Sequence, residues 1–226
     1  CGNLFVEEIE FRTDEDPDVK PYVQEIDISI IKVDLSPELK EIKKHLDSCF
    51  GQKLKAIDRK KYPRLVLDSK KGLLQLQASL QGEIAQGRKD FNVWKTISLI
   101  AEAIKVKHAS ELLETQGITA LHNYLARLME DAAKTKTKAV INLVNDLNFK
   151  SALVLTERLF ERGIEHPKLY ELKRIVSEEV GKNKDVKIIV FNNYRDNVQK
   201  IKKELNGIEG VSAKIFVGQM IKGETG

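Results

Sequence analysis

The amino-acid sequence predicts an α/β protein in which a large all-helical insert, folded as a helical bundle, precedes a truncated parallel α/β unit. Two observations support this fold class. Between about residues 36 and 163, apolar side chains recur every three or four positions, the period of helices with one buried face. From residue 164 onward, helical patterns alternate with short apolar runs typical of buried strands. The chain therefore divides into three segments, 1–35, 36–163 and 164–226.

The first segment is acidic, and it is not predicted to be helical. It holds 3 basic and 10 acidic side chains. Residues 14–18 are predicted to form an acidic turn, because Pro17 fixes its own backbone and disfavours a helix at the residue before it. Isoleucines alternate with polar residues at 26–30, which predicts a strand with one buried face.

The second segment is predicted to contain only helices. Ser36 can cap the first helix, and Pro37 suits its first position. Glycines are expected to end later helices at Gly87, Gly117 and Gly163. Trp94 and Tyr124 lie on apolar helical stripes, and we therefore expect both side chains in the core.

The third segment begins with a helix at Pro167 and continues as strand 186–192, helix 194–206 and strand 211–217. This order predicts two parallel strands joined by a right-handed crossover. Two strands cannot bury both faces of a parallel sheet, so we expect the unit to need strands from elsewhere. The chain also starts at Cys1 and ends at Gly226, and both ends are expected to be cut from a longer protein.

Several kinds of site have no counterpart in the sequence. There is no glycine-rich phosphate loop, and the four histidines and two cysteines lack metal-ligand spacing. We therefore expect no catalysis and no cofactor in this segment of the parent protein. No apolar run approaches the roughly 20 residues of a membrane span, so no membrane partner is expected. Cysteine usage suggests a reducing interior.

Basic side chains are concentrated in the middle segment, which holds 23 basic and 15 acidic residues. The densest groups lie around helix breaks: Lys60, Lys61, Arg64, Lys70, Lys71, Arg88 and Lys89. They are candidate contacts to DNA phosphates, which such clusters bind through charge and shape rather than sequence. The alternative is that these are ordinary solvated loops, and the sequence favours neither interpretation.

Three stretches of the sequence resemble the Hef/Fanconi-anaemia-M family of superfamily 2 DNA helicases. Residues 9–23 are similar to the end of that family's first RecA-like domain. Residues 108–117, His-Ala-Ser-Glu-Leu-Leu-Glu-Thr-Gln-Gly, resemble a signature of the helical domain inserted between the two RecA-like domains. Residues 166–219 resemble the opening of the second RecA-like domain, with helicase motif IV at 187–195.

The resemblance implies that the ATP-binding loop and DExH box lie before this chain and that motifs V and VI lie after it. The parent would then be an ATP-dependent enzyme that uses ATP and Mg²⁺, and this chain would hold a truncated RecA-like unit. The resemblance also implies DNA contacts near the ends of the two predicted strands, at Asn193, Tyr194, Arg195, Gly218, Gln219 and Lys222. Alternatively, Arg195 pairs with Asp196 or Glu209, and residues 218–219 form a simple loop.

These observations predict part of a DNA helicase or translocase that acts on forked or branched DNA in repair. The helical insert would grip duplex DNA, and motif IV would contact the backbone. Expected partners are DNA, the remaining parts of the parent helicase and repair proteins. The alternative is a helical protein-interaction scaffold that binds through apolar surface. The expected location is the nucleoid-associated cytoplasm of a prokaryote or the nucleus of a eukaryote.

Overall fold

The computed structural model describes residues 10–23, 27–57, 69–87, 90–134, 137–192 and 195–216, without the side chains of residues 195 and 196. Residues up to 32 form one compact unit, and residues from 33 onward form another. The first unit contains the short 3-10 helix η2, Lys20–Tyr22.

The acidic turn predicted in the first unit is present. The carboxylate of Asp16 accepts hydrogen bonds from the backbone N–H and the hydroxyl of Thr13, and its carbonyl accepts from Val19 and Lys20. The strand predicted at 26–30 is wrong for the part described, because 27–32 has no partner strand there. Ile28 and Ile30 are 79% and 83% exposed rather than buried. A single extended segment has no neighbour to pair its backbone or cover its apolar face.

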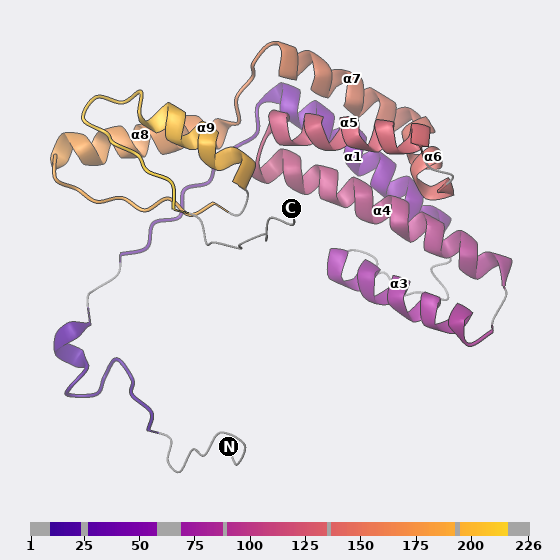
Figure 1. The fold of residues 1–226 in the computed structure, drawn as a ribbon, viewed down its shortest axis with the longest axis horizontal. Helices are drawn as coiled ribbons and strands as arrows, with labels where there is room; N and C mark the ends of the chain where they lie inside the picture. Colours follow the sequence, from indigo (N-terminus) through magenta and orange to yellow (C-terminus); the bar gives the residue numbers. More distant parts are fainter. Residues whose placement is uncertain are drawn as a thin grey trace, which may run out of the picture. The chain divides into compact units, whose positions relative to one another are not determined.

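Eight α-helices are described in the second unit, six of which form the bundle (Figure 1). The bundle helices are α1 (Pro37–Ala56), α3 (Lys70–Ala85), α4 (Phe91–Thr115), α5 (Ile118–Lys134), α6 (Lys138–Asn145) and α7 (Leu147–Glu161). The helical character predicted for the middle segment is thus confirmed. Helix α6 was not predicted as a separate helix, because it has only 8 residues and lies between two longer apolar patterns.

The predicted ends of the helices are also found. The hydroxyl of Ser36 accepts a hydrogen bond from the backbone N–H of Leu39 at 3.4 Å, and Pro37 occupies the first helical position. Gly87, Gly117 and Gly163 follow α3, α4 and α7 with φ of 94°, 87° and 65°. Glycine adopts this left-handed backbone without the steric cost that a Cβ brings.

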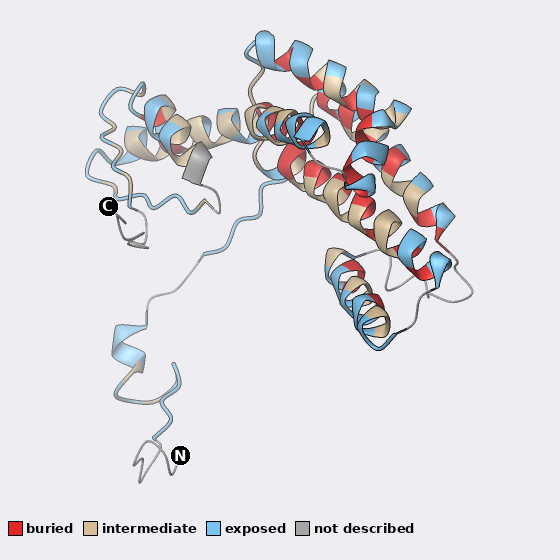
Figure 2. Ribbon diagram, turned by 45° about the vertical axis from the view of Figure 1, so that its right-hand side comes forward, coloured by how far each residue is buried: buried red, intermediate tan, exposed pale blue. Residues whose placement is uncertain are grey.

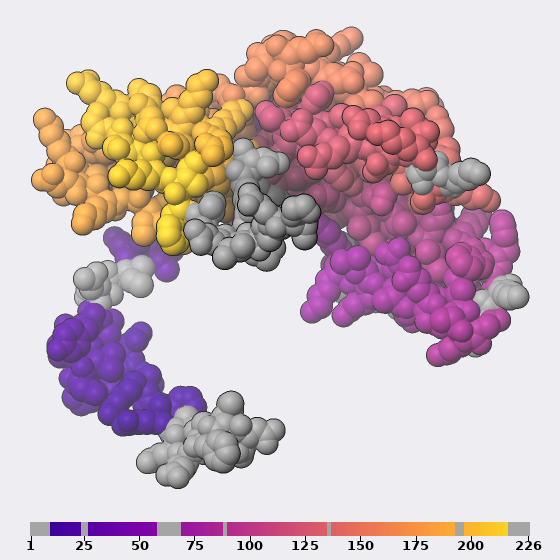
Figure 3. Space-filling view, in the orientation of Figure 1, coloured from indigo at the N-terminus to yellow at the C-terminus, as the bar shows by residue number. Residues whose placement is uncertain are grey.

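The bundle has two clusters of buried side chains. The main cluster joins α1, α4, α5, α6 and α7 and includes Leu46, Leu113 and Phe149, all fully buried. The second cluster joins the end of α1, α3 and α4 through Leu73, Leu80 and Ile100 among others. Figure 2 shows buried residues on the facing sides of these helices, and on the face seen in Figure 3 little of α1 is visible. Both clusters consist of residues between 39 and 159, and Ile164 packs against the main cluster.

The C-terminal part contains α8 (Pro167–Lys182) and α9 (Arg195–Leu205), which are joined by an ion pair between Lys173 and Glu204 at 2.8 Å. The parallel α/β unit predicted here is not present among the described residues, since 186–192 and 211–216 are extended without forming strands. A cavity of about 610 Å³ is lined by both extended segments and by the apolar side of α9. No sheet is formed there to cover these segments, and Phe191 and Phe216 are 91% and 98% exposed.

The two aromatic side chains expected in the core differ in their surroundings. Tyr124 is half-buried against the main cluster, and its hydroxyl donates to the carbonyl of Lys105 at 3.2 Å. Trp94 is 54% exposed, so the core prediction for it is wrong. Val93 and Thr96 occupy the buried side of this first part of α4, which turns Trp94 outward.

Candidate functional site

The C-terminal end of α4 is built by the stretch Leu112–Gly117. The backbone N–H groups of Gln116 and Gly117 both donate to the carbonyl of Leu112, at 2.8 and 3.0 Å, which closes the helix. Gly117 has φ of 87°, and a Cβ at this position would lie 2.9 Å from the Cβ of His166. Gly117 therefore ends α4 and also makes room for His166.

His166 connects this end of α4 to the start of α8. It is only 8% exposed, and its Nδ1 accepts a hydrogen bond from the backbone N–H of Lys168 at 3.1 Å, which caps α8. Burial and, to a smaller extent, the charge of Lys168 lower the pKa of His166, against an opposing effect of the carbonyls of Glu114 and Leu113. The imidazole is thus neutral at pH 7, with its proton on Nε2, because Nδ1 acts as an acceptor.

Three further contacts hold the junction together. The side-chain amide of Asn197 in α9 donates to the carbonyl of Gln116 at 3.3 Å, and Lys168 Nζ donates to the carbonyl of Glu114 at 3.1 Å. Lys200 of α9 pairs with Glu165 at 2.6 Å. Side chains of α8 and α9 therefore satisfy two carbonyl groups at the end of α4, those of Glu114 and Gln116.

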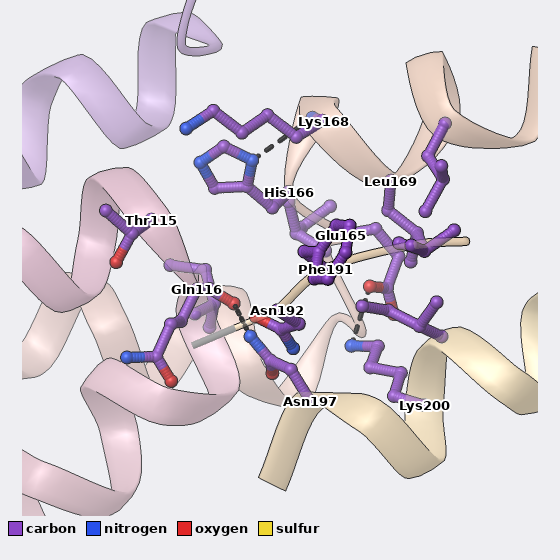
Figure 4. A pocket seen from close by; sticks show the side chains of 15 residues that line it. Thr115, Gln116, Glu165, His166, Lys168, Leu169, Phe191, Asn192, Asn197 and Lys200 are labelled. Atoms are coloured by element: carbon purple, nitrogen blue, oxygen red, sulfur yellow. Dashed lines mark hydrogen bonds and ion pairs between the residues drawn. The ribbon is translucent and has the colours of Figure 1, made fainter. Parts of the chain in front are cut away.

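A cavity of about 200 Å³ lies within this junction (Figure 4). Its lining includes Gln116, His166, Lys168, Phe191, Asn192, Asn197 and Lys200. The residues that carry the second and third stretches of the resemblance, far apart in the sequence, thus meet around one cavity. This convergence makes the junction the candidate functional site.

Motif IV reaches this junction through Asn192 and α9. Arg195 is the first residue of α9, and Asn197 in the same turn is bonded to the end of α4. The direction of this turn is therefore set by the bundle. Its predicted companions Asn193 and Tyr194, and the Arg195 side chain itself, lie outside what the structure describes.

Two of the candidate basic residues of the bundle have described side chains, and they stand at the start of α3. Lys70 Nζ is 2.7 Å from Glu111 Oε2, and the same carboxylate oxygen is 3.6 Å from His108 Nδ1. Burial and then the charge of Lys70 lower the pKa of His108, while Glu111 acts in the opposite direction. Lys70 must leave its ion pair before it can bind a phosphate, whereas Lys71 beside it is exposed.

The other predicted site residues lie outside the described part of the chain. They are Lys60, Lys61, Arg64, Arg88, Lys89, Gly218, Gln219 and Lys222. Their roles remain predictions.

The bundle also contains a buried ionic cluster that was not predicted from the sequence. Lys53 Nζ lies 3.1 Å from Glu102 Oε2 and 3.0 Å from Asp146 Oδ2, with side-chain exposures of 12%, 2% and 11% for the three residues. Burial acts to lower the pKa of Lys53, but its bonds to Asp146 and Glu102 outweigh this and raise it. A signal was available, because Glu102 is the one charged residue in the otherwise uncharged stretch 96–104.

The cluster also affects the neighbouring thiol. Burial, and to a smaller extent the charge of Asp146, raise the pKa of Cys49 to about 12. A thiol with this pKa is inert at neutral pH. Among the described residues, no group of three or more histidine, cysteine or acidic side chains could hold a metal ion. No helix in the described ranges combines the length and apolar character that crossing a membrane requires.

Comparison with known proteins identifies the bundle. Residues 38–163 match the model of a protein family described as the helical bundle of ATP-dependent RNA helicases. The chain is also similar to the crystal structure of the Pyrococcus furiosus Hef helicase domain, with 36% sequence identity and a TM-score of 0.76. That match covers 98% of this chain and 46% of the other.

Related sequences also carry helicase names or belong to the Fanconi-anaemia-M group. A Methanocaldococcus jannaschii protein named as an ATP-dependent RNA helicase is 34% identical over 98% of this chain. The ATP-dependent DNA helicase mph1 of Neurospora crassa and the Fanconi anemia group M protein of Gallus gallus are 27% and 25% identical, each over 96% of this chain. The chain spans 27%, 20% and 13% of the lengths of these three relatives. It belongs to the Hef/Fanconi-anaemia-M family of helicases, with residues 38–163 forming the family's helical bundle.

Proposed function

We propose that the chain is the DNA-gripping insert, with the start of the second RecA-like domain, of an ATP-dependent helicase or translocase that acts on forked or branched DNA in repair. The observation that carries this proposal is the junction, where α9 and α8 bond to the end of α4. Family membership and the helicase names of the relatives support it. The proposed domain limits are 1–35, 36–163 and 164–226.

The junction suggests how such an insert would work. Helix α4 has 25 residues, so it is about 37 Å long and serves as a stiff arm. A shift of the segment that contains Arg195 would be transmitted through Asn197 to this arm. Basic side chains on the bundle would hold phosphates of the duplex, while Asn193, Tyr194, Arg195, Gly218, Gln219 and Lys222 contact the backbone of one strand.

The proposal places ATP and Mg²⁺ in other parts of the parent. The sequence has no phosphate loop, and the described residues offer no cluster of acids for a divalent ion. The residues present therefore do not fit the nucleotide, and no step through it is assigned to this chain. Action on chromosomal DNA would place the parent in the nucleoid-associated cytoplasm or in the nucleus.

The experiment that tests the proposal measures binding of forked DNA against salt concentration. Neutralising Lys60, Lys61, Arg64, Lys70 and Lys71 together is expected to weaken binding and flatten the salt slope, because each lost phosphate contact lowers that slope by about 0.9. The matched control neutralises five exposed lysines elsewhere in the chain: Lys40, Lys44, Lys150, Lys184 and Lys203. If both sets of substitutions weaken binding equally, or if neither set weakens it, the first set does not bind DNA specifically.

A protein-interaction scaffold is the second candidate, and one observation favours it. Leu147 and Val154 are 80% and 46% exposed, and they lie seven residues apart on the same side of α7. A repair protein that docks on this side would bind with little dependence on salt. The same salt series therefore separates the two candidates.

A further inference from the structure

Two aromatic side chains are exposed on the first turn of α4. Phe91 is 78% exposed and Trp94 is 54% exposed. Residues three positions apart on a helix are neighbours on one side, so the two rings share a surface. Val93 and Ile100 hold this part of α4 to the second core cluster, and neither Phe91 nor Trp94 belongs to either cluster.

The residues that flank the pair in the sequence are polar and basic. Its exposed neighbours on α4 are Asn92 and Lys95, neither of which would extend an aliphatic docking patch. Residues 86–98 hold three basic side chains and one acidic side chain. Exposed ring faces beside positive charge are the combination by which proteins bind single-stranded nucleic acid, because every base offers a face for stacking.

We propose that Trp94, with Phe91 beside it, is a stacking platform for unpaired bases of a DNA strand. This inference rests on the proposed function and adds a single-strand contact to a bundle otherwise proposed to hold the duplex. The pair stands at the start of α4, away from the junction at the other end of the same helix (Figures 1 and 3). The same helix, α4, would thus contact DNA bases at its first turn and the motif IV segment at its last turn.

The chain offers a direct probe, since Trp94 is its only tryptophan. Titration with a single-stranded oligothymidine is expected to quench the fluorescence of Trp94, whereas a blunt duplex of the same length quenches it weakly. Binding is measured in parallel by polarisation of a dye on the DNA. Trp94→Ala is expected to weaken single-strand binding about tenfold or more, because stacking on one ring is worth about that much. Trp94→Phe retains a ring and should restore most of the affinity.

Leu147→Ala is the matched control, because Leu147 is an apolar side chain on another helix and is 80% exposed. It is expected to leave binding unchanged, and circular dichroism should show both variants folded. If the single strand binds without quenching, or Trp94→Ala behaves like Leu147→Ala, the stacking platform is wrong while the proposed function stands. Equal quenching by the blunt duplex also overturns it. If the unaltered chain binds no DNA at low salt, both proposals fall.

Discussion

At the scale of single residues, Gly117 and His166 determine the junction together. Gly117 has a left-handed backbone and also stands against the imidazole, so two separate constraints fall on one position. Gly163 has a left-handed backbone with open space around its Cα, so it carries the first constraint alone. Substituting the two glycines therefore separates two contributions to stability: the cost of a Cβ on a left-handed backbone, and the cost of its overlap with His166.

Gly163→Ala is expected to lower the free energy of unfolding by about 1 kcal/mol, the cost of a Cβ in the left-handed region. Gly117→Ala is expected to cost at least about 1 kcal/mol more, because its Cβ would overlap with that of His166 and force a shift. Urea denaturation followed by circular dichroism measures both. Equal losses for the two variants would show that His166 moves aside without cost.

His166 should also make stability depend on pH. Its folded pKa lies below the ordinary value of 6.5, so the unfolded chain binds the proton more readily. The contribution of the neutral imidazole is complete above about pH 6.5 and is lost as the pH falls below it. His108 shifts in the same direction, so it adds to the slope.

The melting temperature is expected to decrease as the pH is lowered from 7.5 to 5.5. His166→Asn keeps a side chain that can cap α8 but does not titrate, so it should reduce the dependence on pH. His108→Gln on the same background should reduce it further. An unchanged slope in the double variant would assign the effect to other groups.

At the scale of helices, the ionic cluster of Lys53, Glu102 and Asp146 fixes how α1 meets α4 and the start of α7. Asp146 has two functions here, because its carboxylate also accepts hydrogen bonds from the backbone N–H groups of Asn148 and Phe149. Glu102 accepts a further bond from the Asn142 side chain at 3.3 Å. The cluster therefore connects four helices, α1, α4, α6 and α7, through charges shielded from water.

Lys53→Met is expected to destabilise the chain by about 3 kcal/mol, because it leaves two buried carboxylates without their cation. Lys43→Met is the matched control on the same helix, where the ion pairs to Asp47 and Glu114 are far more exposed. It should cost less than about 1 kcal/mol. Chemical denaturation compares the two, and similar losses would mean that burial of the cluster carries no extra energy.

The helices were predictable from the sequence because their signals are local. The cap at Ser36, the proline at Pro37 and the terminal glycines each act within one turn of the chain. The junction was not predictable to the same degree, because Gln116 and Asn197 are 81 positions apart and each looks like an ordinary polar residue. Burial of Trp94 was wrongly predicted, because an apolar stripe on a helix gives the period of burial without showing which edge of the stripe faces water.

At the scale of the whole second unit, both core clusters lie between α1 and α7. A chain of residues 33–163 is therefore expected to stay helical and to unfold cooperatively, because it keeps every residue of both clusters. Residues 164–226 alone should show no cooperative transition, since the buried apolar residues described there are Val176 and Leu205. Thermal melts followed by circular dichroism test both, and a weakly helical 33–163 would place the boundary elsewhere.

The division of the core also has a consequence for how the protein can change over evolutionary time. The apolar contacts of helix α3 with α4 and the end of α1 belong to the second cluster, and α3 contributes no residue to the main cluster. Insertions or deletions before and after α3 would therefore leave α5, α6 and α7 undisturbed. This edge of the bundle is where we expect related proteins to differ most in length, and where amide hydrogens should exchange with solvent first.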